Sequence, residues 1–67
     1  MFHIVYSCGD RTRLAVVEIC AGMEYELNDY DVASRRSHDT EDEAYQYAKK
    51  LASDHNLILE SETAYLD

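Results

Sequence analysis

The chain has 67 residues, a length that forms one domain, residues 1–67, and leaves little room for a deep catalytic cleft. Its apolar fraction of 46% and its six tyrosines are too high for a disordered chain. Fourteen acidic residues against six basic ones leave a net charge of -8, which opposes direct binding to nucleic acid phosphates. The same excess attracts a basic partner surface and also maintains solubility, so both interpretations stay open.

The chain carries no signal of export, membrane insertion or metal binding. It has no run of about 18 apolar residues, and its N-terminal residues lack the basic start and apolar run of a signal peptide, so we expect a cytoplasmic protein. Cys8 and Cys20 are then expected to be reduced, buried thiols. They show no paired-ligand spacing with His3, His38 or His55, so neither a metal site nor a cofactor is predicted.

The N-terminal part of the chain predicts two antiparallel strands. Residues 2–8 alternate with a period of two, and residues 13–20 follow with a run of β-branched side chains. Gly9 and Asp10 tolerate positive backbone angles and predict a tight turn between the strands. In the second strand, the side chains expected to face the core are Ala15, Val17 and Ile19.

The next segment, MEYELNDYDV, alternates apolar and acidic side chains. Residues 23–27 are therefore predicted to form a third strand with one wet face. Its inward side chains would be Met23, Tyr25 and Leu27, and its outward side chains Glu24 and Glu26. Residues 28–31 are rich in Asn and Asp, whose side chains bond to their own backbone, and predict a bend. The sheet is expected to resume in residues 32–37.

At Thr40 the hydrophobic period changes from two residues to three or four. The TEDE sequence predicts a capping box at the start of a helix, in which the Thr40 hydroxyl accepts from the Glu43 amide and the Glu43 carboxylate accepts from the Thr40 amide. The helix is expected to end at Asn56, a residue that tolerates the left-handed conformation. Residues 57–61 then predict a last strand, and residues 62–67 an acidic tail. The apolar stripe of the helix consists of Ala44, Tyr47, Ala48, Leu51 and His55.

These elements predict an α+β fold in which an antiparallel sheet carries one helix on one face, in the order β-β-β-α-β. One helix covers only one face of this two-layer sandwich, so the opposite face is expected to be open. That face would carry Val5, Leu14 and Val16, although open antiparallel faces are normally polar. These three residues form a candidate self-association surface, and a structural or accessory subunit that homodimerises through it is the alternative functional hypothesis.

No combination of residues predicts catalysis. The chain lacks a nucleophile elbow, a glycine-rich phosphate loop and a zinc-peptidase helix, so we expect no enzymatic activity and assign no catalytic residue. Arg35 and Arg36 form a basic pair that either contacts RNA or balances the acidic residues at 39–42. We favour the balancing role.

The acidic residues between Arg13 and Arg35 are the most informative functional signal. No basic residue interrupts them, and folding alone does not require such charge segregation. Alternating Glu residues can also serve only to solvate a strand. Tyr30 lies in the turn-forming segment with Asp on both sides, and an exposed Tyr is typical of an interface hot spot. The predicted partner-binding residues are Glu24, Glu26, Asp29, Tyr30 and Asp31.

A short, acidic α+β chain with clustered carboxylates and without catalytic motifs resembles phage-encoded inhibitor proteins, a class that includes anti-CRISPR proteins, DNA mimics and host-takeover factors. The resemblance covers size, charge and element order, and it transfers no residue. The chain departs from DNA mimics in its moderate net charge. The resemblance implies a non-enzymatic inhibitor in the host cytoplasm that occupies a basic, nucleic-acid-binding site on a protein complex and needs no cofactor.

Overall fold

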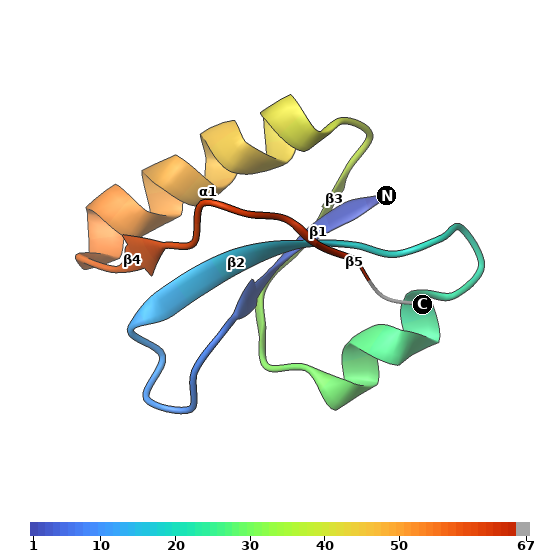
Figure 1. Ribbon diagram of the computed structural model, residues 1–67, viewed down its shortest axis with the longest axis horizontal. Coiled ribbons are helices and arrows are strands. Elements are labelled where there is room, and N and C mark those ends of the chain that lie inside the picture. Colours follow the sequence, from blue (N-terminus) through green and yellow to red (C-terminus); the bar gives the residue numbers. More distant parts are fainter. Residues whose placement is uncertain (66–67) are drawn as a thin grey trace.

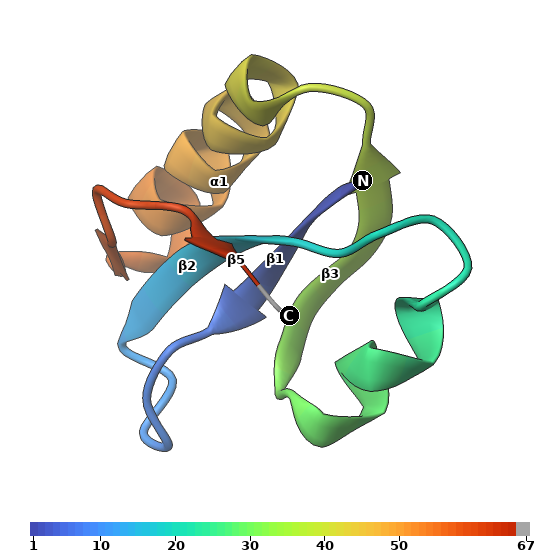
Figure 2. The ribbon, with the colours of Figure 1, turned by 45° about the vertical axis from the view of Figure 1, so that its right-hand side comes forward.

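The computed structural model describes residues 1–65 and shows one sheet with a helix on each face (Figure 1). Leu66 and Asp67, at the end of the predicted acidic tail, lie outside the described residues. The long helix and a short 3-10 helix lie on opposite sides of the sheet, as a rotated view also shows (Figure 2). The elements are β1 (Phe2–Tyr6), β2 (Arg13–Glu18), η1 (Glu24–Asp29), β3 (Val32–His38), α1 (Glu41–His55), β4 (Ile58–Leu59) and β5 (Ala64–Tyr65).

The sheet is mixed, with the strand order β3-β1-β2-β4 and with β5 also paired to β2. β1 runs antiparallel to β2 and β3, whereas β4 and β5 run parallel to β2. The predicted α+β class is confirmed, and the prediction of a purely antiparallel sheet is wrong. The physical reason is the path of α1, which carries the chain back along the sheet so that Ile58 enters beside Arg13, at the start of β2.

Two crossover connections link parallel strands and lie on opposite faces of the sheet. One runs from β2 past β1 to β3 and contains η1, and the other runs from β3 past β1 and β2 to β4 and contains α1. Such crossovers are almost always right-handed. Because these two cross the sheet in opposite directions, connections of the same hand must use opposite faces. The prediction of an open sheet face is therefore wrong.

The first apolar cluster lies between the sheet and α1. It joins Ile4, Leu14 and Val16 of the strands to the alanines of the helix, Ala44, Ala48 and Ala52. Small side chains on the helix allow its backbone to approach the sheet closely. The period of two in β2 was correct, but its two faces were assigned the wrong way round, because Leu14 and Val16 point toward α1.

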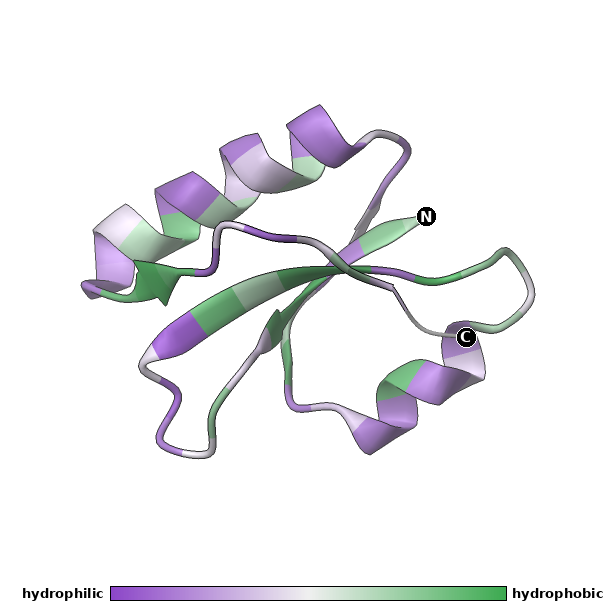
Figure 3. Cartoon of the chain, in the orientation of Figure 1, coloured by the Kyte–Doolittle hydropathy of each residue, from purple (hydrophilic) through white to green (hydrophobic). Residues whose placement is uncertain are grey.

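The second cluster lies on the opposite face, beneath η1. Its buried members are Val5, Ala15, Val17 and Ile19, and the partly buried Met23, Leu27 and Val32 pack against them. Apolar residues are concentrated in the strands, whereas η1 and much of α1 are hydrophilic (Figure 3). Both faces of β1 and β2 are thus buried, which explains the near-continuous apolar runs in their sequences.

The predicted self-association residues lie in the interior of the protein. Val5, Leu14 and Val16 are 2%, 1% and 0% exposed, respectively. Val5 is covered by η1, and the other two are covered by α1. The hypothesis that they form a surface patch is wrong because it assumed a sheet with only one covered face.

Residues 23–27 lie in and next to a 3-10 helix, so the prediction of a strand there is also wrong. Met23 and Leu27 are four residues apart, a spacing that places two side chains on one side of a helix as well as of a strand. The apolar second face needs a cover, and the crossover to β3 has to pass over that face. Tyr25 then points outward and is 63% exposed, which corrects its predicted place in the core.

The predicted limits of α1 are confirmed. The Glu43 amide donates to the Thr40 hydroxyl at 3.2 Å, and three acidic residues occupy the first turn. The other half of the predicted capping box, a bond from the Thr40 amide to the Glu43 carboxylate, is not formed within residues 1–65. Asn56 adopts the left-handed conformation with a φ of 56° at the C-terminus. Within residues 1–65, no helix combines the length and the apolar character that a membrane crossing requires.

Thr40→Ala is expected to lower the free energy of unfolding by about 1 kcal/mol, because the Glu43 amide loses its acceptor. Urea denaturation measures this difference. Thr40→Asp should restore most of the stability, since Asp is also a good N-cap residue. Ser53→Ala, at an exposed position inside the same helix, is the control and should not destabilise the protein. Equal stability of Thr40→Ala and the wild type would contradict the assigned cap.

Candidate functional site

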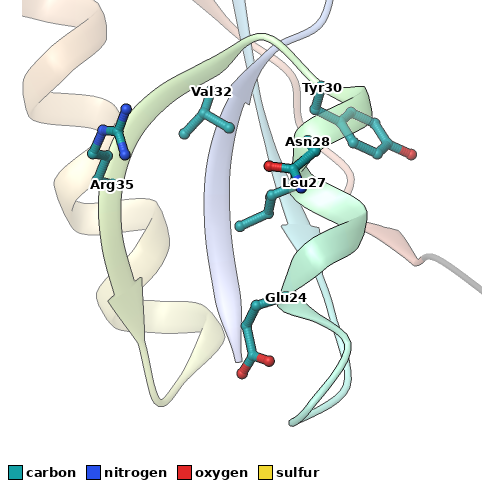
Figure 4. Close-up of a pocket in the computed structure, with 6 residues that line it drawn as sticks. All are labelled: Glu24, Leu27, Asn28, Tyr30, Val32 and Arg35. Atoms are coloured by element: carbon teal, nitrogen blue, oxygen red, sulfur yellow. The ribbon is translucent and has the colours of Figure 1, made fainter.

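A pocket lies between η1 and β3, next to the predicted partner-binding residues. It has a volume of about 490 Å³. Leu27 points toward β1, whereas the ring of Tyr30 points away from the sheet (Figure 4). Glu24 and Arg35 lie on opposite sides of this pocket, Glu24 on η1 and Arg35 on β3. The lining residues are Glu24, Leu27, Asn28, Tyr30, Val32 and Arg35.

The 3-10 geometry explains which residues of η1 meet at this pocket. With three residues per turn, Glu24 and Leu27 lie one turn apart on the same side of η1. Leu27 packs against the second apolar cluster and anchors that side to the sheet. The Tyr30 amide donates to the Leu27 carbonyl at 3.0 Å, which ends the helix with Tyr30 in an extended conformation. Glu24 and Tyr30 are therefore held one turn before and one turn after an apolar anchor.

Asp31 differs from the other predicted partner-binding residues because it has an intramolecular partner. Arg11 donates from Nε and Nη2 to the two carboxylate oxygens of Asp31, at 2.8 and 3.0 Å. The hydrogen bonds from Arg11 to Asp31, and then the negative charge of that carboxylate, raise the pKa of Arg11 above its ordinary value. This pair connects the start of β3 to the turn between β1 and β2. Asp31 thus has a positioning role that its sequence context did not indicate.

A second carboxylate, Asp10, organises the same turn. Its Oδ1 accepts from the Cys8 thiol at 2.9 Å, from the Thr12 hydroxyl at 2.7 Å and from the Thr12 amide at 3.1 Å. These hydrogen bonds, that of Cys8 first, hold the pKa of Asp10 below its ordinary value. The residue with positive φ is Arg11, at 59°, and not Gly9 or Asp10 as predicted. The turn presents Arg11 to Asp31.

Three carboxylates of η1 have no basic side chain paired with them within residues 1–65. The ion pairs within residues 1–65 join Arg11 to Asp31 and Arg13 to Glu60, so Glu24, Glu26 and Asp29 form none there. Glu24 and Asp29 are exposed, and Glu26 is half-buried. Two tyrosines accompany them, since Tyr25 is 63% exposed and Tyr30 is 37% exposed. We define the acidic η1 surface as Glu24, Tyr25, Glu26, Asp29 and Tyr30.

Tyr25 is the member of the acidic η1 surface that the sequence interpretation missed. A strand places Tyr25 on the buried side with Met23 and Leu27, whereas in η1 its side chain is 63% exposed. Its hydroxyl donates to the Met23 sulfur at 3.3 Å. The i, i+4 spacing of Met23 and Leu27 fits a strand and a helix equally, so the local sequence held no signal of its exposure.

The basic pair on β3 is divided between the two faces of the sheet. β3 contains a bulge, because Phe2 pairs with His38 while Ile4 pairs with Ser34, which leaves residues 35–37 opposite His3. Arg35 lines the pocket, whereas the Arg36 guanidinium lies 4.8 Å from the centre of the Tyr47 ring. Neither forms an ion pair within residues 1–65, so the predicted pairing with the acidic residues at 39–42 is wrong.

The two cysteines are free thiols. Cys8 is half-buried beside Asp10, and Cys20 is exposed, so the prediction of a buried side chain is wrong for Cys20. In the described part of the chain, no three His, Cys, Asp or Glu side chains lie close enough to hold a metal ion together.

Comparisons of this chain with protein-family models, with curated proteins and with solved structures found no match. A function is therefore inferred from the geometry and charge of the acidic η1 surface.

Proposed function

We propose that this protein is a non-enzymatic inhibitor that uses the acidic η1 surface to occupy a basic, nucleic-acid-binding site on another protein. One observation supports this proposal above all others. Glu24, Glu26 and Asp29 form no ion pair within residues 1–65, although they lie within one turn or two of each other beside two exposed tyrosines. Folding does not need this arrangement, whereas lysines and arginines of a partner would neutralise it.

The dimensions of η1 suit a short stretch of nucleic acid backbone. At a rise of about 2 Å per residue, its six residues span about 12 Å. One strand of a duplex carries a phosphate about every 3.4 Å, so three carboxylates over this length approach the charge of three or four phosphates. The surface would thus occupy part of a basic groove and not a whole duplex-binding site, which agrees with the moderate net charge.

The tyrosines would supply contact area that charge alone lacks. Electrostatic attraction mainly raises the association rate and sets orientation, whereas buried aromatic side chains supply much of the affinity. Tyr25 and Tyr30 are positioned for this role, one on the outer side of η1 and one at its end. A target that holds nucleic acid in a positively charged channel, such as a CRISPR effector complex in the host cytoplasm, has the required chemistry.

The alternative function, a subunit that homodimerises through an open sheet face, has no support, because the residues of that proposed interface are buried. Leu14 and Val16 contact α1, and Val5 lies beneath η1. We therefore propose no second function.

The double variant Glu24→Lys/Asp29→Lys tests the proposal, because it reverses two exposed charges and leaves Glu26 and Asp31 in place. It changes the net charge from -8 to -4, since each reversal adds two positive charges. Tagged protein is used to capture partners from a lysate of the cells in which the chain occurs, and competing duplex DNA or RNA then releases them. We expect the variant to capture its target at least about tenfold less, and high salt to weaken wild-type capture.

Asp54→Lys/Glu62→Lys is the matched control, because it makes the same change in net charge at exposed positions away from η1. It should capture the same nucleic-acid-binding proteins as the wild type. Equal losses in both variants would show that only net charge matters. Undiminished capture by the η1 variant, or partners that nucleic acid does not displace, would contradict the proposed function.

A further inference from the structure

His3 is a buried titratable side chain without a hydrogen-bond partner. It is 4% exposed, and neither ring nitrogen has a partner within residues 1–65. It pairs with Val17 across β1 and β2, and the bulge of β3 lies on its other side. Buried polar groups in folded proteins are nearly always hydrogen-bonded, so two unpartnered ring nitrogens require an explanation.

The surroundings of His3 favour its neutral form. Burial lowers the pKa of His3 below its ordinary value of 6.5, and the terminal ammonium of Met1 lowers it further. Glu24 on η1 opposes these effects, while His38 on β3 adds a smaller lowering. β3 also places the positive charge of Arg35 on this side of the sheet, at the pocket beside η1. β2 contributes only the uncharged Val17 at the paired position. A protonated His3 is therefore poorly accommodated while its cover is closed.

The element that covers His3 is weakly anchored to the sheet. None of the six residues of η1 is buried, whereas α1 buries three alanines. The segment 20–31 is attached through Met23 and Leu27, which are partly buried. At its end, Asp31 forms the ion pair with Arg11, and its carbonyl accepts from the Tyr6 amide at 2.8 Å. Segments with few buried apolar contacts open locally at lower free energy than the rest of a fold.

We propose that residues 20–31 form a pH-sensitive cover, which opens away from the sheet when His3 takes up a proton from solvent at mildly acidic pH. β1, β2 and α1 stay in place, because their shared apolar cluster lies on the other face of the sheet. Opening gives the imidazolium access to water and separates η1 from the apolar face beneath it. The proposal does not depend on the proposed function, since it concerns the isolated protein.

The direction of the pH dependence follows from proton linkage. The closed form binds the His3 proton more weakly than the open form, because the pKa of His3 is lowered only while the segment is closed. Closure is therefore fully favoured above pH 6.5 and is progressively lost as the pH falls below that value. At pH values between the pKa of His3 in the closed form and its pKa in the open form, each fall of one pH unit should raise the ratio of open to closed protein about tenfold.

Hydrogen–deuterium exchange of the full chain between about pH 7.5 and about pH 5.5, read out by mass spectrometry, measures this opening. After correction for the intrinsic pH dependence of exchange, amides in residues 20–31 should lose protection at the lower pH. Amides in α1 (Glu41–His55) should keep theirs and serve as the internal reference. Equal loss in both regions would indicate global unfolding and overturn the proposal.

Two histidine variants separate His3 from the other titrating groups. His3→Phe keeps a ring in the buried position and should abolish the pH dependence in residues 20–31. His55→Gln changes an exposed histidine at the end of α1 and should leave it unchanged. Loss of the dependence in His38→Phe but not in His3→Phe would assign the sensor to His38 and overturn the proposal.

If His3→Phe does not fold, the NMR signals of the imidazole groups in the wild-type protein provide a second test. In an NMR titration, the closed form should show His3 titrating below 6.5, and signals of residues 20–31 should change over the same pH range. His3 titration at or above 6.5, or unchanged signals for the segment, would overturn the proposal.

Discussion

Replacing Leu14 with alanine is expected to lower the free energy of unfolding by about 2–5 kcal/mol. Leu14 is 1% exposed and packs among the strand residues and alanines of the first apolar cluster, so its removal leaves a cavity that a rigid sheet and helix cannot fill. At about 0.05–0.15 kcal/mol per residue, a domain of this size has a total stability of only about 3–10 kcal/mol. The variant should therefore be partly or largely unfolded at room temperature.

Urea denaturation followed by circular dichroism measures this loss. Ile58→Ala is the control, because Ile58 is also aliphatic but is 53% exposed, and its loss should be below about 1 kcal/mol. An equally small effect of Leu14→Ala would place Leu14 at the surface, as the self-association hypothesis required. A large effect with no change in oligomeric state would agree with its place beneath α1.

Ala48→Leu should also destabilise the protein, by about 1–3 kcal/mol, because the helix–sheet interface has no room for a larger side chain. Ala48 is completely buried and lies in the middle of the three alanines that face the strands. Leucine has a helix propensity close to that of alanine, so a loss of stability would come from packing and not from the backbone.

Lys49→Leu places the same side chain one position further along α1, where the helix faces solvent. Its stability should lie within about 0.5 kcal/mol of the wild type in the same urea experiment. If Ala48→Leu were as stable as Lys49→Leu, α1 would not approach the sheet as closely as its alanines indicate. If both variants were destabilised equally, the effect would not be specific to the interface.

The acidic η1 surface was only partly predictable from the sequence. Uninterrupted negative charge between Arg13 and Arg35 identified Glu24, Glu26 and Asp29, because charge segregation is visible along the chain itself. Asp31 looked equivalent to them, but its ion pair comes from Arg11, twenty residues away, whose left-handed backbone points it back toward β3. Tyr25 was missed because exposure depends on whether its segment is a strand or a helix, and local spacing was compatible with both.

The pH-sensitive cover was not predictable at all. In the sequence, His3 lies in a largely apolar strand, but no local pattern shows which segment covers its side of the sheet. The His3 side chain is shielded from solvent because the crossover from β2 to β3 passes over it and a bulge in β3 lies beside it. These features bring residues 20–31 and 35–37 close to His3, and no local sequence pattern indicates such distant contacts.

The features that the sequence was sufficient to establish are those whose causes lie within one or two turns of backbone. Thr40 and Asn56 limit α1 through bonds to nearby amides and through a left-handed φ, so they act the same way in almost any surroundings. The alternation in β1 and β2 likewise follows from strand geometry. Which face of each strand meets α1, the parallel direction of β4 and the helical form of η1 depend on the tertiary fold. Both faces of one small sheet have to be covered, and two crossovers of the same hand have to take opposite sides.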